Sequence, residues 1–474
     1  TQGAEYPEVA AVVGNLAALY LVIGSDTKVE PLLRRALAIR EKTSGPEHPL
    51  VATTLHNLAI LAAAQRNYPS AVSLLKRSLQ IEERTIQNVF PFTTEPEKLR
   101  FIQSTSGNYM AYLSLLHQQG KDQQNLVRDG LELVLRRKGI VFDAQARVQE
   151  GLQGRMSESS RKEWERLSVL RGEYARLLLK RPEHMSTALH RERLNALQKD
   201  IEATEKTLAG QSALVAGELK QRNITVEVAA KAVPENGVLV EFVRIEDFDF
   251  SKGTRLPSAR YLAFVLTSVG EVTLVDLGEA TKLEKEMQGA LDGIRMALNR
   301  RDVASITHSQ QSLAGLYTSL WSPLAPAFGS ADHIVLSPDG LLNLIPFSAL
   351  RAPDGRFLLE RYHLAYVASS RELVSRGDSL VPPTTELLLV ANPAFDDTIS
   401  GAANPDGALR SRDFGGTFSP LPGTAREANE IPPLVAGDGA KKQVMLGASA
   451  TERVVKNVHS PRILHVATHG FFLG

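Results

Sequence analysis

The sequence contains no cysteine among its 474 residues. That absence excludes disulfide bonds, thiolate metal sites and a cysteine nucleophile within these residues. An excess of one charge is also lacking, since 54 Lys+Arg against 53 Asp+Glu give a formal net charge of +1, and this balance argues against direct binding of nucleic acid. No apolar run reaches the roughly 18 residues of a membrane helix, and no signal peptide opens the chain. We therefore expect a cytoplasmic protein with no membrane partner.

The overall composition is that of a globular protein. Hydrophobic residues make up 43% of the chain and charged residues 23%, which is ordinary for a chain with a packed core. At about 150 residues per domain, the length predicts roughly three domains.

A repeat with a period of 42 residues occupies the N-terminal part of the chain. The sequence pattern of residues 6–38 recurs 42 residues later in strict register, so that Pro7 is matched by Pro49 and Asn15 by Asn57. A fixed period of this size indicates stacked helical hairpins. Small residues at the matched helix contacts let paired helices approach closely; they are Ala17, Ala36, Ala59 and Ala71.

This pattern resembles the tetratricopeptide repeat, and we assign residues 1–85 to it. The resemblance implies a concave scaffold that binds a protein or peptide partner; alternatively, these helices only support their neighbours. At least three repeats are usually needed for independent stability. Since two are clear here, we expect further repeats to precede Thr1.

Helical patterns continue up to residue 224. Residues 86–156 have the spacing of degenerate repeat-like helices, and residues 157–224 that of an amphipathic helical hairpin. The hairpin is either a partner-binding arm or a solvated helix pair packed on its own domain. The basic cluster Arg136-Arg137-Lys138 is expected to be a solvated helix face rather than a nucleic-acid site.

From residue 225 to residue 474, strands alternate with helices. This order predicts an α/β domain with a mainly parallel sheet covered on both faces, in which 261–266 and 272–276 form a hairpin. The stretch 463–470 reads as a strand that ends in a histidine, His469. In such sheets the chemistry gathers at the carboxyl ends of the strands. The expected fold class is thus α + α/β, a helical solenoid and hairpin followed by a sheet domain.

Five motifs follow one another along this C-terminal part. They are L-S-P-D-G-L-L-N-L-I-P-F (Leu336–Phe347), A-N-P (Ala391–Pro393), P-L-P-G-T-A-R-E (Pro420–Glu427), G-A-S-A-T-E (Gly447–Glu452) and H-V-A-T-H-G (His465–Gly470). In this order, behind tetratricopeptide repeats, they resemble the CHAT domain, a bacterial caspase-like and separase-like peptidase module. The resemblance implies a caspase-type sheet, a Cys–His dyad that cleaves peptide bonds in protein substrates, and no cofactor.

The same resemblance makes His469 the dyad histidine and gives the backbone N–H of Gly470 a place in the oxyanion hole. Imidazole has a suitable pKa to activate a thiol, and a glycine leaves the backbone N–H close to the scissile carbonyl. The alternative for His469 is a histidine satisfied at a sheet edge. His465 and His469 also spell H-x-x-x-H, but zinc peptidases place such a pair on a helix with Glu after the first histidine. We expect no metal and assign His465 to structural support.

Two further motif segments leave their roles open. Asp339 and Gly340 match a family turn, although a tight turn after a strand also explains them. The segment Pro420–Thr424 either borders the substrate cleft or caps the helix that follows.

The cysteine of the family's dyad is missing. In caspases it follows the histidine by about 50 residues, whereas this sequence stops five residues after His469. We therefore expect the chain to be a fragment, truncated before the nucleophile, of a cysteine endopeptidase with a repeat module for protein recognition or regulation. The main alternative is a catalytically inactive scaffold for protein interactions. A helical regulatory protein with an unrelated α/β domain is a weaker one.

Overall fold

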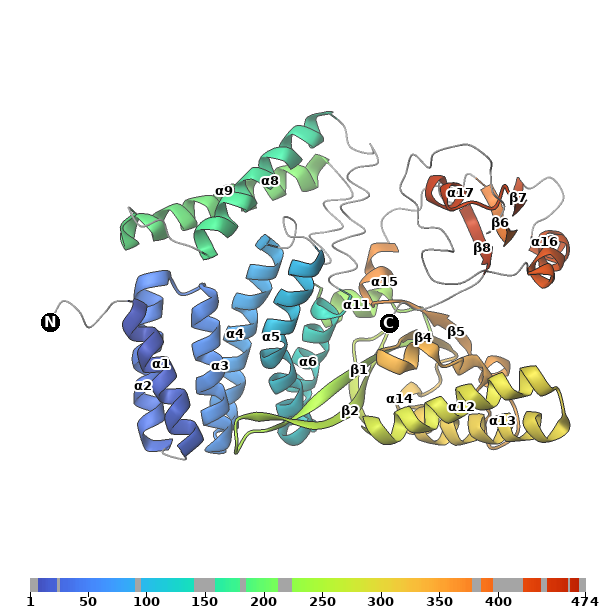
Figure 1. Cartoon of the computed structure of the whole chain (residues 1–474), viewed down its shortest axis with the longest axis horizontal. Helices are drawn as coiled ribbons and strands as arrows, with labels where there is room; N and C mark the ends of the chain where they lie inside the picture. The colour runs from blue at the N-terminus through green and yellow to red at the C-terminus, as the bar shows by residue number, and fades with distance from the viewer. Residues whose placement is uncertain are drawn as a thin grey trace. The chain divides into compact units, whose positions relative to one another are not determined.

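The computed structural model of the chain (Figure 1) describes residues 7–23, 26–89, 95–139, 158–179, 185–211, 224–376, 385–394, 421–435, 441–458 and 461–468. It divides into two compact units, Thr1–Asp378 and Ser379–Gly474. Among the described residues, no helix combines the length and the apolar character needed to cross a membrane.

Two helix pairs build the repeat region. They are α1 (Pro7–Ile23) with α2 (Asp26–Ser44), and α3 (Pro49–Ala64) with α4 (Tyr68–Val89). The linker before α3 turns at Gly45, whose φ is +97°, and the His48 side chain accepts a hydrogen bond from the Leu50 N–H to cap the helix. The four small residues predicted at the helix contacts, Ala17, Ala36, Ala59 and Ala71, are all fully buried.

Further helices continue this first unit. They are α5 (Glu95–Leu115), a short π-helical turn (Leu116–Gly120), α6 (Gln124–Arg137), α8 (Glu158–Leu179), α9 (Thr187–Gln211) and α11 (Val226–Ala232). The pair α8–α9 forms a hairpin with its own apolar seam, in which Leu167, Leu197 and Leu208 are buried. In the structure α8 contacts α4, and α9 contacts α2.

A five-stranded sheet completes the first unit. Its strands are β1 (Gly237–Asp249), β2 (Thr254–Thr267), β3 (Val272–Glu279), β4 (His333–Ser337) and β5 (His363–Tyr366), in the order β3-β2-β1-β4-β5. The predicted hairpin is confirmed, since β2 and β3 pair antiparallel. The expectation of a mainly parallel sheet holds for β1, β4 and β5 but not for β1, β2 and β3, which are antiparallel because short turns connect them.

Both faces of this sheet are covered, as expected (Figure 1). Alternate side chains of β1 point to opposite faces. Leu239 and Val243 pack with residues of α3–α6 and α11, whereas Val240 and Phe242 pack toward α12 (Ala280–Arg300), α13 (Val303–Leu316) and the turn that carries Trp321. The repeat helices and the sheet therefore share one hydrophobic core.

The second unit is a smaller parallel sheet. Its strands are β6 (Thr385–Pro393), β7 (Lys442–Gly447) and β8 (Pro461–Ala467), in the order β7-β6-β8. On one face Leu387 and Leu389 pack against α16 (Pro422–Val435), and on the other Leu388 and Val390 pack against residues of α17 (Glu452–Asn457). Burial on both faces explains why β6 reads as a continuous apolar run.

Candidate functional site

The candidate site is the carboxyl edge of the sheet in the second unit. Because its three strands are parallel, they end at the same edge, β6 at Pro393, β7 at Gly447 and β8 at Ala467. Open α/β sheets bind their ligands at this edge.

Asn392, at the end of β6, ties the A-N-P motif to the start of α16. Its Oδ1 accepts a hydrogen bond from the N–H of Leu421 at 2.8 Å, and its own N–H donates to Oγ1 of Thr424 at 2.9 Å. The φ of Asn392 is +44°, a left-handed conformation that asparagine tolerates better than most residues. Two motifs that lie 29 and more residues apart in sequence thus meet at one point of the edge.

Thr424 supports this contact from the first turn of α16. Its hydroxyl donates to the carbonyl of Leu421 at 2.8 Å while accepting from Asn392. The helix-start interpretation of Pro420–Thr424 accounts for these bonds, and a border to a substrate cleft stays a prediction.

His465, in the middle of β8, contacts the same helix. Its Nε2 lies 3.1 Å from Oε2 of Glu427, one turn after Thr424 on α16. The imidazole and the carboxylate are both partly exposed. This contact links the H-V-A-T-H-G motif to the P-L-P-G-T-A-R-E motif, and it fits the supporting role expected for His465.

A fourth motif forms the turn after β7. The carbonyl of Gly447 accepts from the N–H of Ala394 at 3.2 Å, and Oγ of Ser449 accepts from the N–H of Leu446 at 3.0 Å. Ala450 is buried with Leu388 and Val390 under the sheet. Four of the five sequence motifs therefore converge on this unit.

His469 and Gly470 lie outside the described residues. The described strand β8 ends at Ala467, two residues before His469 in the sequence. Within the described ranges, no group of three or more His, Asp or Glu side chains is placed to hold a metal ion. Of the two histidines in the H-x-x-x-H pattern, the structure describes only His465, and its imidazole contacts the carboxylate of Glu427.

Comparison with known families identifies the two parts of the chain. A family model described as "CHAT domain" matches residues 310–474, and one described as "Tetratricopeptide repeat" matches residues 8–84. The chain carries tetratricopeptide repeats followed by a CHAT domain. The CHAT match begins within α13, so β1–β3 lie outside it, and the wider boundaries drawn from the sequence stay predictions. No curated protein matches the chain.

The fifth CHAT motif lies in the first unit, at the end of β4. Oδ2 of Asp339 accepts from the N–H of Arg244 at 2.8 Å, which fixes the turn against β1. A Cβ atom on Gly340 would come within 2.7 Å of Oη of Tyr261, and the φ of Gly340 is +55°. This position therefore requires glycine, and a tight turn is a sufficient explanation for both motif residues.

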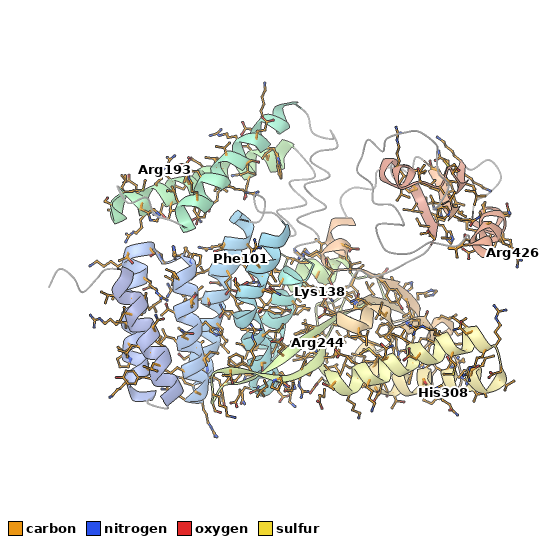
Figure 2. All side chains as sticks on the ribbon, in the orientation of Figure 1. Phe101, Lys138, Arg193, Arg244, His308 and Arg426 are labelled. Atoms are coloured by element: carbon orange, nitrogen blue, oxygen red, sulfur yellow. The ribbon has the colours of Figure 1, made fainter. Side chains whose placement is uncertain are left out.

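The same CHAT motif closes a buried polar cluster at the carboxyl end of β4. Nζ of Lys138, just after α6, donates to Oε1 of Glu241 on β1 at 2.6 Å and to the carbonyl of Ser337 at 2.7 Å. Lys138 is labelled in Figure 2. The hydroxyls of Ser337 and Ser370 both donate to the Glu241 carboxylate. Glu241 is only 1% exposed, so the end of α6 is anchored to the sheet of the first unit.

This cluster overturns the expectation of a solvated basic face at 136–138. Arg137 pairs with Glu82 at 2.8 Å, with both side chains only 7% exposed, and Lys138 pairs with Glu241. Each of these cations has a carboxylate partner from a distant element. Sequence analysis missed Glu241, although a single charged residue within the apolar strand G-V-L-V-E-F-V was a signal of buried pairing.

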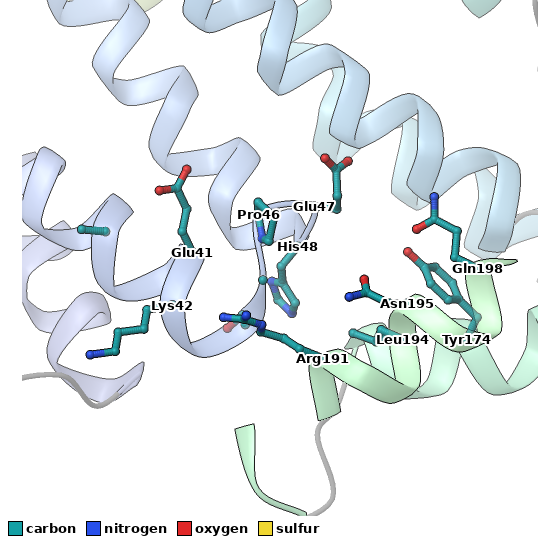
Figure 3. A pocket seen from close by; sticks show the side chains of 13 residues that line it. Glu41, Lys42, Pro46, Glu47, His48, Tyr174, Arg191, Leu194, Asn195 and Gln198 are labelled. Atoms are coloured by element: carbon teal, nitrogen blue, oxygen red, sulfur yellow. The ribbon is translucent and has the colours of Figure 1, made fainter. Parts of the chain in front are cut away.

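A cavity of about 670 Å³ lies in the first unit between the α2–α3 turn and α9 (Figure 3). Arg191 extends toward His48, and Tyr174 lies near the opposite end, where burial raises the pKa of its hydroxyl. The carboxylate of Glu47 is engaged by Arg84 at 2.7 Å. The cavity is lined jointly by residues of the α2–α3 turn and of the α8–α9 hairpin.

Proposed function

We propose that the chain is part of a CHAT-family cysteine endopeptidase, with His469 as the general base and the Gly470 N–H as an oxyanion donor. The observation that carries the proposal is the convergence of four CHAT motifs at the carboxyl edge of one parallel sheet. Ligands of open α/β sheets bind at that edge.

In this mechanism the imidazole of His469 accepts the proton of a cysteine thiol. The thiolate attacks the scissile carbonyl of a protein substrate, and the developing oxyanion accepts a hydrogen bond from the Gly470 N–H. The protonated imidazole then donates its proton to the leaving amine. Since the 474 residues contain no cysteine, the proposal requires a thiol from outside them.

Described residues of the second unit hold this edge in place. Asn392 and Thr424 join β6 to α16, and Glu427 joins the same helix to His465 on β8. We assign these four residues to positioning, because they set the direction from which the chain leaves β8 toward His469.

The tetratricopeptide repeats supply the protein-recognition or regulatory module in this proposal. Repeats of this family generally bind proteins. Since the repeat helices share a core with the sheet of the first unit, a partner bound to the repeats has a direct mechanical connection to that sheet.

The second candidate function is a catalytically inactive scaffold. It keeps the same two-part architecture and differs from the peptidase only in lacking the nucleophile. Reading the coding sequence beyond the codon for Gly474 separates the two: a Ser-Ala-Cys-like strand end about 50 residues after His469 supports the peptidase, and its absence supports the scaffold.

A peptidase assay on the protein with that extension tests the mechanism. His469→Ala should lower kcat/KM at least about 100-fold, because a positioned general base contributes roughly that factor. His308→Gln, at an exposed histidine of α13 outside the second unit, is the matched control and should retain most activity. Equal cleavage by wild type and His469→Ala rejects the catalytic assignment.

A further inference from the structure

The cavity between the α2–α3 turn and α9 has the size of a ligand site. Its volume of about 670 Å³ falls within the range of roughly 300–1,000 Å³ that such sites occupy. Its lining combines the turn at 44–48 with Tyr174 of α8 and a row of residues on α9. Repeats that precede Thr1 would stack on α1, because each repeat contacts only its neighbours. The cavity lies instead at the turn between the two described repeats, so such repeats do not fill it.

The guanidinium of Arg191 is a free cation in this lining. Within the described part of the chain, Arg191 makes no ion pair or hydrogen bond, and Figure 3 shows it extending toward the α2–α3 turn. The two carboxylates of the lining are already engaged, since Glu41 pairs with Arg77 at 2.5 Å and Glu47 with Arg84 at 2.7 Å. A guanidinium recognises a carboxylate through two parallel hydrogen bonds. The cavity therefore favours an anionic ligand.

The hydroxyl of Tyr174 is a second free donor. Tyr174 lines the cavity and is only 5% exposed, and its hydroxyl has no hydrogen-bond partner among the described residues. Burial raises the pKa of this hydroxyl, so it stays protonated at neutral pH. Buried polar groups are normally hydrogen-bonded, and leaving a donor without a partner costs free energy. An acceptor on a ligand would satisfy this donor.

The row on α9 has the length of a short peptide. Arg191, Asn195 and Gln198 follow one another at spacings of four and three residues, which places them on one side of the helix. At 1.5 Å per residue this row is about 10 Å long, and about three residues of extended chain cover the same distance. Each amide side chain offers both donors and an acceptor, which match the C=O and N–H groups of a peptide backbone.

We propose that this cavity binds an extended acidic segment of a partner protein. An Asp or Glu carboxylate of that segment binds the guanidinium of Arg191, and its backbone lies along Asn195 and Gln198. The α8–α9 hairpin is then a partner-binding arm that closes on the repeat turn. The proposal deepens the recognition role proposed for the repeats and rests on it. Because Arg191 is exposed, added salt should weaken the binding.

The test uses fluorescein-labelled hexaglutamate with the 474-residue protein, followed by fluorescence anisotropy. Hexaglutamate should bind the wild type, whereas hexaglutamine, which has the same backbone without the charge, should bind at least tenfold more weakly. Arg191→Ala should weaken the binding of hexaglutamate at least tenfold. Tyr174→Phe, which removes only the hydroxyl, should weaken it about fivefold, as expected for the loss of one hydrogen bond.

The matched control is Arg176→Ala, which removes an exposed arginine of the same hairpin outside the cavity lining and should leave the affinity unchanged. Circular dichroism of the variants should match that of the wild type. Absence of binding by the wild type, or equal weakening by Arg191→Ala and Arg176→Ala, overturns the proposal. Displacement of hexaglutamate by an equal concentration of inorganic phosphate also overturns it, because the cavity is then a site for small anions. None of these measurements depends on peptidase activity, so their failure is distinct from failure of the catalytic assignment.

Discussion

The imidazole of His56 is enclosed where α3, α5 and the β1–β2 hairpin meet. Its ring lies 6.4 Å from that of Phe248, edge to face. Burial lowers the pKa of His56 from 6.5 to about 4, with a smaller opposing effect from its hydrogen bond with Asn108 and a further lowering by the charge of Arg255. The native state therefore holds this histidine neutral.

We predict that the first unit loses stability as the pH falls from about 6.5 toward 4. Below its ordinary pKa the unfolded chain protonates His56 while the folded chain does not, so the stabilisation is complete above pH 6.5 and is lost through the folded pKa. The loss at pH 5 should be about 2 kcal/mol, from about 1.4 kcal/mol per pH unit. Urea midpoints at pH 7 and pH 5 measure it.

His56→Gln removes this titration and keeps a hydrogen-bonding side chain, so the difference between the two midpoints should shrink. His308→Gln, at an exposed histidine of α13, should retain the full difference. A His56→Gln variant with the wild-type pH dependence would show that another group is responsible.

The second prediction at the scale of residues concerns the stability that the ion pair of Lys138 and Glu241 provides. Glu241→Gln should lower the free energy of unfolding by about 3 kcal/mol, because the ammonium of Lys138 then stays buried without its counter-charge. Combining it with Lys138→Met should cost less than the sum of the single changes, by about 1–3 kcal/mol. Chemical denaturation of the four proteins gives the coupling.

The exposed pair of Asp354 and Arg356 is the control for this cycle. Asp354→Asn should cost less than about 1 kcal/mol, since water screens an exposed pair. Similar costs for Glu241→Gln and Asp354→Asn would contradict the buried role.

At the scale of elements, the β1–β2 hairpin joins the sheet to the repeat-like helices. The N–H of Phe248 donates to Oγ of Ser114 on α5 at 3.0 Å, and Nε2 of Gln118 donates to the Phe248 carbonyl at 3.0 Å. Arg255, on β2, donates to Oγ of Ser106 at 2.8 Å. Backbone and side chains both take part in this contact.

We predict that Phe248→Ala destabilises the first unit by about 3 kcal/mol, because it removes a buried aromatic ring and leaves a cavity beside His56. Val269→Ala, at an 80% exposed position after β2, should change stability by no more than about 0.5 kcal/mol. Thermal unfolding of both variants measures the two losses of stability. Equal losses would contradict the placement of the β1–β2 hairpin in the hydrophobic core.

The β1–β2 hairpin also shows which strand ends could not be predicted from the sequence. From the sequence, the apolar run G-V-L-V-E-F-V predicts a strand at 237–243, and a second run predicts one at 261–266. In the structure β1 continues to Asp249 and β2 begins at Thr254. The added residues include Arg244, Glu246, Asp247 and Arg255, which have no local strand pattern. Ser114 of α5 and Gln118 of the π-helical turn after it hold the extended part of β1 at Phe248, and these contacts are invisible to local spacing.

The candidate site likewise has features that the sequence predicted and features that it could not predict. Motif order predicted the CHAT domain, and strand patterns predicted a mainly parallel sheet with His469 at the carboxyl end of a strand. The bonds that assemble the carboxyl edge of the sheet were not predictable, because Asn392 and Thr424 lie 32 residues apart and His465 and Glu427 lie 38 apart. The roles of His469 and Gly470 stay predictions.

At the scale of the whole molecule, the shared core predicts how the chain opens. Residues of α5, α6, β1 and β2 belong to one hydrophobic cluster, whereas β6–β8 belong to a separate compact unit. Hydrogen exchange followed by mass spectrometry should show α5, α6, β1 and β2 exchanging through one common opening, and β6–β8 through another. Exchange of α5 and α6 well before β1 and β2 would contradict a single cooperative unit.

The position of Trp321 gives the chain an internal optical label. The sequence has two tryptophans, Trp164 in the α8–α9 hairpin and Trp321 in the fully buried core beside the five-stranded sheet. Residues 379–474 contain neither tryptophan nor tyrosine. Intrinsic fluorescence therefore reports only on the first unit, and a ligand that acts on the CHAT edge alone will be silent by this method until a fluorophore is introduced there.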